Sequence, residues 1–226
     1  MVLMRDVLGE GIAYPVILSD EKEALSAAKA AGSAFAAIGS GLPEADYAVE
    51  TVEAVDERFL ERLVRRHLGL PWRIAESERL RIREVTKRDQ EEFLRWDSDL
   101  IFTSSDLLEA YIQNQYRFYE YGVWAVVRKE EDTLIGAAGV YDWEDETRET
   151  HLELGYEIFP PYRRMGYAEE ACRQILNYIT EEYECPVWAS VWETNIPSRA
   201  LLEKLGFVKV PGCSGSGQLR YRFGRC

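Results

Sequence analysis

The sequence predicts an α/β chain in two parts: a small, partial doubly wound α/β unit over residues 1–75, and a larger α+β domain with a mixed central sheet over residues 76–226. Strand and helix patterns alternate along the first part, which is typical of strands joined by helices. In the second part three strand patterns follow one another before a long amphipathic helix. Between them lies the segment 68–72, Leu-Gly-Leu-Pro-Trp, whose glycine and proline favour a boundary near residue 75.

The first part has a β-α-β-β-α pattern. The predicted elements are a strand at 13–18, an alanine-rich helix at 21–31 that Gly32 ends, strands at 34–38 and 45–51, and a helix that Asp56 caps. Segments 18–32 and 45–47 resemble the C-terminal third of haloacid dehalogenase-like phosphatases.

That resemblance does not extend to the catalytic residues of those phosphatases. They need an early Asp-x-Asp, and nothing before Ala13 supplies it, whereas Asp97-Ser98-Asp99 ends a predicted helix in the other part. Ala24 stands where a second acidic metal ligand is expected after Asp20. We expect a non-catalytic remnant that serves in docking or oligomerisation, for example in a homodimer.

The second part begins with Leu80, Ile82 and Val85 alternating with arginines, which predicts an outer strand. Further predicted elements are helices at 89–97 and 105–119, strands at 123–128, 134–141, 151–158 and 187–192, a long helix after Gly166, a short helix that Ser198 caps and Gly206 ends, a strand from Phe207, and a flexible loop at 212–217 before the last strand.

The junction at residues 154–168 is a strand, a glycine-containing turn and the start of the long helix. The first amides of a helix have no intrahelical acceptors and lie at the positive end of its dipole, so such a turn can hold a pyrophosphate. No Gly-Lys-Ser/Thr follows Gly166, and the three glycines of a dinucleotide fingerprint are missing. The P-loop and dinucleotide classes are therefore excluded.

Two motifs resemble the GNAT superfamily of N-acetyltransferases. Arg163-x-x-Gly166-x-Ala168 after a strand resembles its acyl-CoA pyrophosphate loop, and the segment 195–207, with Asn-x-x-Ser and Glu-Lys-x-Gly-Phe, resembles its second signature. The segment 77–89 resembles the start of the ribosomal-protein-alanine N-acetyltransferase branch. The likeness covers residue 78 to about 224, two thirds of the chain, and implies a mixed GNAT-type sheet with acetyl-CoA as co-substrate.

The resemblance also implies which residues bind the co-substrate. Backbone groups of Tyr156, Glu157 and Ile158 would hold the pantetheine and carbonyl, and Asn195 would approach from the neighbouring strand end. The amides that would hold the pyrophosphate belong to Arg163, Arg164, Met165, Gly166, Tyr167 and Ala168.

Acetyl transfer to an amine needs a base and an acid. Glu153 matches a carboxylate that this branch carries and would take the amine's proton; alternatively it pairs with an arginine of an adjacent strand. Many relatives have a tyrosine seven residues after the asparagine as thiolate acid, but here that residue is Leu202. Ser198, water or the ammonium product must then act instead, or the protein does not turn over.

Three functions follow. The first is an acetyl-CoA-dependent N-acetyltransferase acting on a small amine or a protein N-terminus; the others are a non-catalytic acetyl-CoA sensor or scaffold, and a protein-interaction module built on the N-terminal unit. The acceptor region, 89–121, is aromatic and acidic, which suits a cation near an aromatic face or an ordinary core.

Composition excludes several classes. A net charge of −13 argues against nucleic-acid binding; it suits a cationic substrate, or an ordinary solubilising surface. The longest apolar runs are too short for a membrane span, and no secretory signal is evident, so a cytoplasmic location is expected. The four cysteines lack C-x-x-C spacing, which predicts no metal site and places Cys172 in the core.

Overall fold

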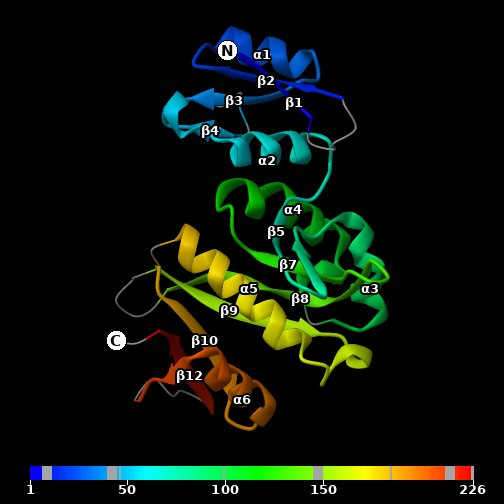
Figure 1. Ribbon diagram of the computed structural model, residues 1–226, viewed down its shortest axis with the longest axis vertical. Helices are drawn as coiled ribbons and strands as arrows, with labels where there is room; N and C mark the ends of the chain where they lie inside the picture. Colours follow the sequence, from blue (N-terminus) through cyan, green and yellow to red (C-terminus); the bar gives the residue numbers. More distant parts are fainter. Residues whose placement is uncertain are drawn as a thin grey trace. The chain divides into compact units, whose positions relative to one another are not determined.

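Figure 1 shows a computed structural model of the chain, which describes residues 1–6, 12–39, 45, 47–98, 100–144, 150–183, 185–211 and 217–224. The chain divides into two compact units, Met1–Trp72 and Arg73–Cys226, and each has its own sheet. Most of the predicted glycine- and serine-rich loop, residues 212–216, lies outside the described residues, as do Asp99, Cys213 and Cys226.

The first unit is a four-stranded sheet with a helix on each face (Figure 1), as a partial doubly wound unit requires. Strand β2 pairs in parallel with β3, and β3 with β4, while β1 is antiparallel to β2. The elements are β1 (Val2–Arg5), β2 (Tyr14–Ser19), α1 (Lys22–Ala30), β3 (Ala34–Ile38), β4 (Ala48–Val49), a 3₁₀ turn (Val52–Ala54) and α2 (Glu57–His67).

The first unit has a hydrophobic core of its own. Val16, Leu18, Ala34 and Ala36 of the sheet are buried in one cluster with Leu60, Leu63 and Val64 of α2. As predicted, Asp56 caps α2, accepting a hydrogen bond of 2.6 Å from the amide of Phe59. Strand β1 was not predicted, and the predicted strand at 45–51 is reduced to two residues among those described.

The second unit is an eight-stranded mixed sheet in the order β11-β12-β10-β9-β8-β7-β6-β5. Its strands are β5 (Arg73–Glu76), β6 (Leu80–Arg83), β7 (Val123–Arg128), β8 (Thr133–Glu144), β9 (Thr150–Ile158), β10 (Val187–Trp192), β11 (Phe207–Lys209) and β12 (Gln218–Phe223). Its helices are α3 (Gln90–Arg95), α4 (Ser105–Phe118), α5 (Tyr167–Glu182) and α6 (Ile196–Leu205), with 3₁₀ turns at Lys87–Asp89, Ile101–Thr103 and Pro160–Tyr162.

Helices cover both faces of this sheet. Ala125 of β7 packs in a core cluster with Phe93 of α3 and Leu108 of α4, whereas the adjacent Trp124 contacts Tyr178 of α5 edge-on. Since neighbouring residues of a strand point to opposite faces, α3 and α4 lie on one face and α5 on the other (Figure 1). As predicted, Cys172 of α5 is fully buried.

One prediction about this sheet is wrong. Strand β6 is not an outer strand, because β5 pairs antiparallel with it and forms the edge. The sequence pattern of β6 is still explained, since Leu80 and Ile82 are buried while Arg81 and Arg83 are partly exposed.

The aromatic residues of segment 89–121 act largely as core. Phe102 and Tyr116 are buried. Phe102 belongs to the same core cluster as Phe93, and Trp96 and Tyr111 pack against that cluster. The Tyr116 hydroxyl accepts from the amide of Val85 and donates to the carbonyl of Val123, so it fastens α4 to the sheet. Among the described residues, no helix is long and apolar enough to cross a membrane.

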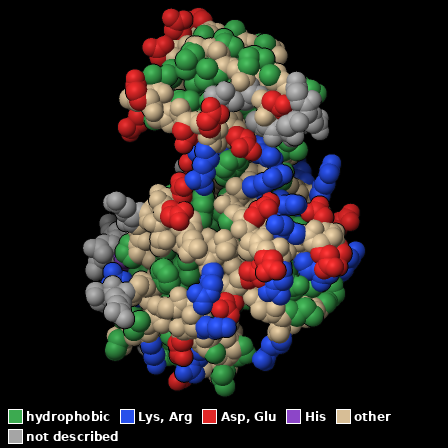
Figure 2. Space-filling model, in the orientation of Figure 1, with side chains coloured by type: hydrophobic (Ala, Val, Ile, Leu, Met, Phe, Trp, Pro, Cys, Tyr) green, Lys and Arg blue, Asp and Glu red, His purple; other side chains and the backbone are tan. Residues whose placement is uncertain are grey.

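On the face shown in Figure 2, acidic and basic side chains of the second unit intermingle. On that face of the second unit, the acidic side chains are therefore not gathered into one patch. An ordinary solubilising surface explains this face of the second unit better than a surface that attracts cationic substrates.

Candidate functional site

The central feature is an opening between two parallel strands, β9 and β10. They pair only at Leu152–Val187 and Glu153–Trp188, although β9 runs on to Ile158 and β10 to Trp192. Beyond Glu153 the two strands therefore diverge, and the edge of β9 that faces β10 has no strand partner in the part of the chain that the structure describes. Unpaired backbone groups at such an edge need a ligand, water or side chain.

Strand alternation shows which backbone groups face the opening. The amide of Leu152 donates toward β10, to the carbonyl of Pro186, and that of Phe159 donates toward β8, to Ile135. Backbone groups of Tyr156 and Ile158 therefore face the opening, whereas those of Glu157 face β8. Of the three residues predicted to hold the pantetheine, Glu157 thus has its backbone in the sheet; its carboxylate accepts a 2.5 Å hydrogen bond from Ser98.

The loop after β9 leads into the start of α5. Gly166 is the N-cap residue with a left-handed φ of 83°, and it offers no side chain as a cap. The amides of Tyr167, Ala168 and Glu169 therefore have no acceptor within the helix. Arg164 also has a positive φ, 64°, which is strained for a non-glycine residue.

The opening, the loop and α6 together enclose a pocket of about 850 Å³, which suits a large co-substrate. Its lining residues are Tyr156, Glu157, Ile158, Tyr162, Arg163, Arg164, Gly166, Tyr167, Ala168, Glu169, Asn195, Pro197, Ser198, Ala200, Leu201 and Lys204. Nearly all predicted co-substrate residues meet here, although they come from three elements. Met165 is not among them: its side chain is 52% exposed and its carbonyl accepts from Arg79.

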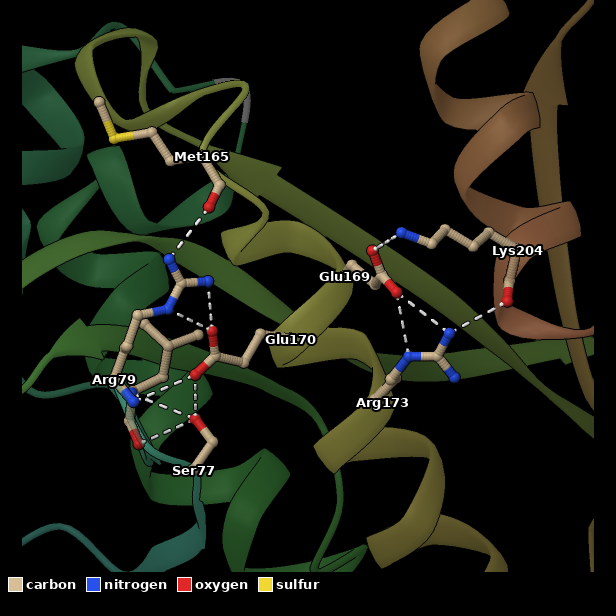
Figure 3. A network of polar contacts seen from close by, with 8 residues as sticks. Ser77, Arg79, Met165, Glu169, Glu170, Arg173 and Lys204 are labelled. Carbon is tan, nitrogen blue, oxygen red and sulfur yellow. Dashed lines mark hydrogen bonds and ion pairs between the residues drawn. The ribbon is translucent and has the colours of Figure 1, made fainter.

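Figure 3 shows how Arg79 holds this loop in place. Arg79 donates to the carbonyl of Met165 at 3.1 Å and to the Glu170 carboxylate at 2.7 Å, and its guanidinium lies 4.4 Å from the Tyr167 ring centre. Ser77 donates to the same carboxylate at 2.7 Å. The segment before β6 thereby fixes the first turn of α5.

A second network in Figure 3 joins α5 to α6. The Glu169 carboxylate accepts from Lys204 at 2.5 Å and from Arg173 at 3.1 Å, and Arg173 also donates to the carbonyl of Lys204 at 3.2 Å. Two cations surround one carboxylate, so this network, of which Glu169 and Lys204 line the pocket, has a net positive charge. It suits an anionic ligand.

Asn195 and Ser198 begin α6, but with roles that differ from the prediction. Asn195, not Ser198, is the N-cap: its side-chain oxygen accepts from the amide of Ser198 at 3.2 Å. Ser198 is thus free of the capping role and lines the pocket close to Tyr156. Gly206 ends the helix with a φ of 97°, as predicted.

Glu153 lies at the apex of the opening, outside the pocket lining. It is 5% exposed, and its carboxylate accepts from Tyr141 at 3.1 Å and from Arg220 of β12 at 3.2 Å. Burial, together with this carboxylate, raises the pKa of Tyr141 well above its ordinary value. Glu153 does pair with an arginine, although β12 is not adjacent to β9 and β10 lies between them. The 44% exposed Tyr141 connects Glu153 to solvent.

Sequence reasoning missed part of α6 and its neighbours. Pro197, Ala200, Leu201 and Lys204 line the pocket at helical spacing, which marks one face of the helix. Lys204 belongs to the Glu-Lys-x-Gly-Phe motif, and helical spacing back from Lys204 would have pointed to the other three residues. Tyr162 and Glu169 were likewise missed, and among the described residues no cluster of metal-ligating side chains was found.

The comparisons with known proteins agree with this geometry. The family described as the acetyltransferase (GNAT) domain matches residues 79–208, more than half of the chain. The uncharacterized N-acetyltransferase YoaA of Bacillus subtilis (strain 168) is 29% identical over 149 residues, which cover 60% of this chain and 83% of YoaA. YjdG of the same organism is 30% identical over 86 residues, covering 38% of this chain and only half, 50%, of YjdG.

Among solved structures, a GnaT-family acetyltransferase from Bordetella pertussis shares the fold with a TM-score of 0.56 at 18% identity, over 66% of this chain and 98% of that one. The ribosomal-protein-alanine branch and the phosphatase likeness of the N-terminal unit are not established by these comparisons and stay predictions. The divergent strands, the glycine turn and the family match together show that this chain belongs to the GNAT acetyltransferase family.

Proposed function

We propose that the protein is an acetyl-CoA-dependent N-acetyltransferase that transfers the acetyl group to a primary amine, either a small amine or a protein N-terminus. The observation that carries the proposal is the pocket between β9, the glycine loop and α6. It offers free helix amides and cations at one end and an unpaired strand edge at the other. A co-substrate with a pyrophosphate and a peptide-like arm needs both.

Different residues of the pocket would bind different parts of the co-substrate. Amides of the loop and of the first turn of α5 would hold the pyrophosphate, with Arg164 and Lys204 supplying charge. The free edge of Tyr156 would pair with the amide groups of the pantetheine arm. Asn195 would keep α6 in register with that arm through its cap.

Glu153 would take the amine's proton at the apex of the opening. It is enclosed, so the proton would reach it through water or through the Tyr141 hydroxyl, which already donates to it. Arg220 pairs with the same carboxylate at 3.2 Å and would hold it in place for this role.

Calorimetric titration with acetyl-CoA and with desulfo-CoA tests the binding half of the proposal. We expect both to bind, because the pocket holds the nucleotide and the arm rather than the sulfur. Binding of neither would refute the proposal. A screen of polyamines, amino sugars, amino acids and peptide N-termini for release of CoA thiol would then identify the acceptor.

Two variants test the assigned roles, each against a matched control. Glu153→Gln should lower kcat and shift its pH profile, while Asp89→Asn, which also breaks a buried pair with an arginine, should only destabilise the fold. Asn195→Ala should reduce turnover, while Ser104→Ala, the cap of α4, should not. Unchanged turnover in Glu153→Gln or Asn195→Ala would contradict the assigned role.

A second candidate function is non-catalytic binding of acetyl-CoA as a sensor or scaffold. The observation that favours it is Leu202, which is buried and apolar where the family resemblance places a proton-donating tyrosine. Detectable acetylation of any amine in the screen would exclude this alternative.

A further inference from the structure

Tyr156 lines the pocket. The Tyr156 hydroxyl is buried, and its one polar neighbour is Ser198, which makes no well-aligned hydrogen bond with it among the described residues. By contrast, Tyr111, Tyr116 and Tyr141 of the same unit are all hydrogen-bonded. A buried hydroxyl without a good partner destabilises the fold, so a ligand group that pairs with this one would remove that penalty.

The Tyr156 hydroxyl lies on the side of the pocket where the reacting end of the co-substrate would lie; this step rests on the proposed function. An arm that leaves the glycine loop along the free edge of β9 passes Ile158 and then Tyr156 on its way to the apex at Glu153. Ser198, in the first turn of α6, lies next to the same hydroxyl.

The surroundings keep this hydroxyl protonated and disfavour a bare thiolate. Burial raises the pKa of Tyr156 to about 12, with Ser198 opposing the rise. Burial likewise raises the pKa of the neighbouring Cys172 thiol well above its ordinary value. A thiolate released beside these groups would be as poorly solvated, and so would be a stronger base than in water.

We propose that Tyr156 is a further catalytic residue, which donates its hydroxyl proton to the sulfur that leaves the acetyl group. The amine nitrogen forms a bond to the carbonyl carbon, the carbon–sulfur bond breaks, and its electron pair stays on sulfur. The proton of Tyr156 neutralises that sulfur as a thiol. Ser198 then passes a proton from water to the tyrosinate, while the proton that the amine loses goes to the base.

The test uses the full chain, with hydroxylamine as a small acceptor and two donors, acetyl-CoA and acetyl-seleno-CoA. A selenolate is a far better leaving group than a thiolate and needs no proton to depart. Tyr156→Phe keeps the ring and removes only the hydroxyl. Tyr162→Phe is the matched control, because it removes a hydroxyl from the same pocket wall.

We expect Tyr156→Phe to lower kcat with acetyl-CoA by about 10²-fold without weakening acetyl-CoA binding in calorimetry. With acetyl-seleno-CoA the loss should largely disappear, and Tyr162→Phe should show no such dependence on the donor. Ser198→Ala should show the same donor dependence more weakly.

Three outcomes would overturn the inference. If Tyr156→Phe turns over acetyl-CoA at the wild-type rate, the hydroxyl donates nothing. An equal loss with both donors would make Tyr156 a positioning residue. If the wild type binds acetyl-CoA but releases no CoA to hydroxylamine or any screened amine, both the proposed function and the inference fail. If the wild type turns over normally, a negative result with Tyr156→Phe contradicts only the role given to Tyr156.

Discussion

At the residue scale, Arg164 combines a strained backbone with a charge at the pocket. Its φ of 64° is costly for an L-residue with a long side chain, and no ion pair of its guanidinium occurs among the described residues. A strained arginine at this position is explained if the loop needs both this backbone conformation and a positive charge at the pocket. Strain at a ligand-binding loop is a common trade of stability for function.

Arg164→Gly should therefore change stability and binding in opposite directions. We expect the free energy of unfolding to rise by about 1 kcal/mol as the strain is relieved, while the affinity for acetyl-CoA falls because a cation is lost. Urea unfolding and calorimetry measure the two effects. Arg164→Gln, which keeps a side chain but removes the charge, should weaken binding without the gain in stability.

Glu170 links two segments that lie 91 residues apart in sequence, through its pairing with Arg79. Burial alone would raise the pKa of this carboxyl, but hydrogen bonds from Ser77 and Arg79 outweigh burial and hold it below the ordinary value. Because the folded-state pKa is lowered, the stabilisation is complete above the unfolded pKa of about 4.3. It is lost as the pH falls through the folded value.

Comparing Glu170→Gln with the wild type should show that dependence. At pH 7 the variant should be less stable, and the difference should close as the pH falls below about 4.3. Glu181→Gln, on the same helix and without an ion pair among the described residues, is the control. A gap between Glu170→Gln and the wild type that stays constant with pH would contradict the role given to this carboxylate.

At the scale of elements, two glycines at helix ends have similar backbone conformations but different expected roles. Gly166 begins α5 with a φ of 83°, and Gly206 ends α6 with a φ of 97°. A Cβ at Gly166 would lie 3.5 Å from the guanidinium of Arg79, and one at Gly206 would lie 3.8 Å from the Phe223 ring. Both are ordinary contacts, so the cost of alanine is conformational at each site.

Gly166→Ala and Gly206→Ala should each lower the free energy of unfolding by about 1–2 kcal/mol. Only Gly166→Ala should also weaken acetyl-CoA binding, because the strain would displace the amides proposed to hold the pyrophosphate. Thermal unfolding and calorimetry on both variants measure this. Equal affinities in the two variants would mean that the loop is not the pyrophosphate site.

The elements that sequence reasoning recovered share a physical property. Strands β3, β7 and β10 have their predicted bounds because their mostly apolar runs are followed closely by polar or turn residues. Strand β5, Arg73–Glu76, was missed because it is short and begins only two residues after Pro71. Its pattern alone cannot be told from that of a linker; pairing with β6 makes it a strand.

In the site, too, local features were predictable from the sequence and contacts between distant segments were not. The glycine loop was predictable because a helix start carries its own signal in Gly166 and the periodic residues after it. The partners of Glu153 were not, because Arg220 lies 67 residues away and meets it only through sheet order. Tyr156 was expected to act through its backbone, since strand alternation does not reveal that its hydroxyl lacks a well-aligned hydrogen bond among the described residues.

At the scale of the whole molecule, the division of the chain bears on which part carries the activity. The family match at residues 79–208 and the pocket both lie in the second unit. Each unit has its own sheet and hydrophobic core. We propose that the boundary falls between Trp72 and Arg73 rather than near residue 75, because β5 completes the larger sheet.

Two truncated chains test that boundary. Residues 73–226 should fold cooperatively and bind acetyl-CoA as the full chain does, since no strand of the larger sheet is lost. A chain of residues 77–226 lacks β5, which removes the buried side chain of Ile74 and the pairing that covers the edge of β6. It should be less stable by about 2–5 kcal/mol and more prone to aggregate.

Urea unfolding of both chains, followed by circular dichroism, gives that difference directly. Equal stability would place the boundary after Glu76 and make β5 part of the linker. A non-cooperative transition for residues 73–226 would instead mean that the larger unit needs the smaller one to fold. In that case the N-terminal unit would serve first as a structural support for the acetyltransferase domain, before any role in docking or oligomerisation.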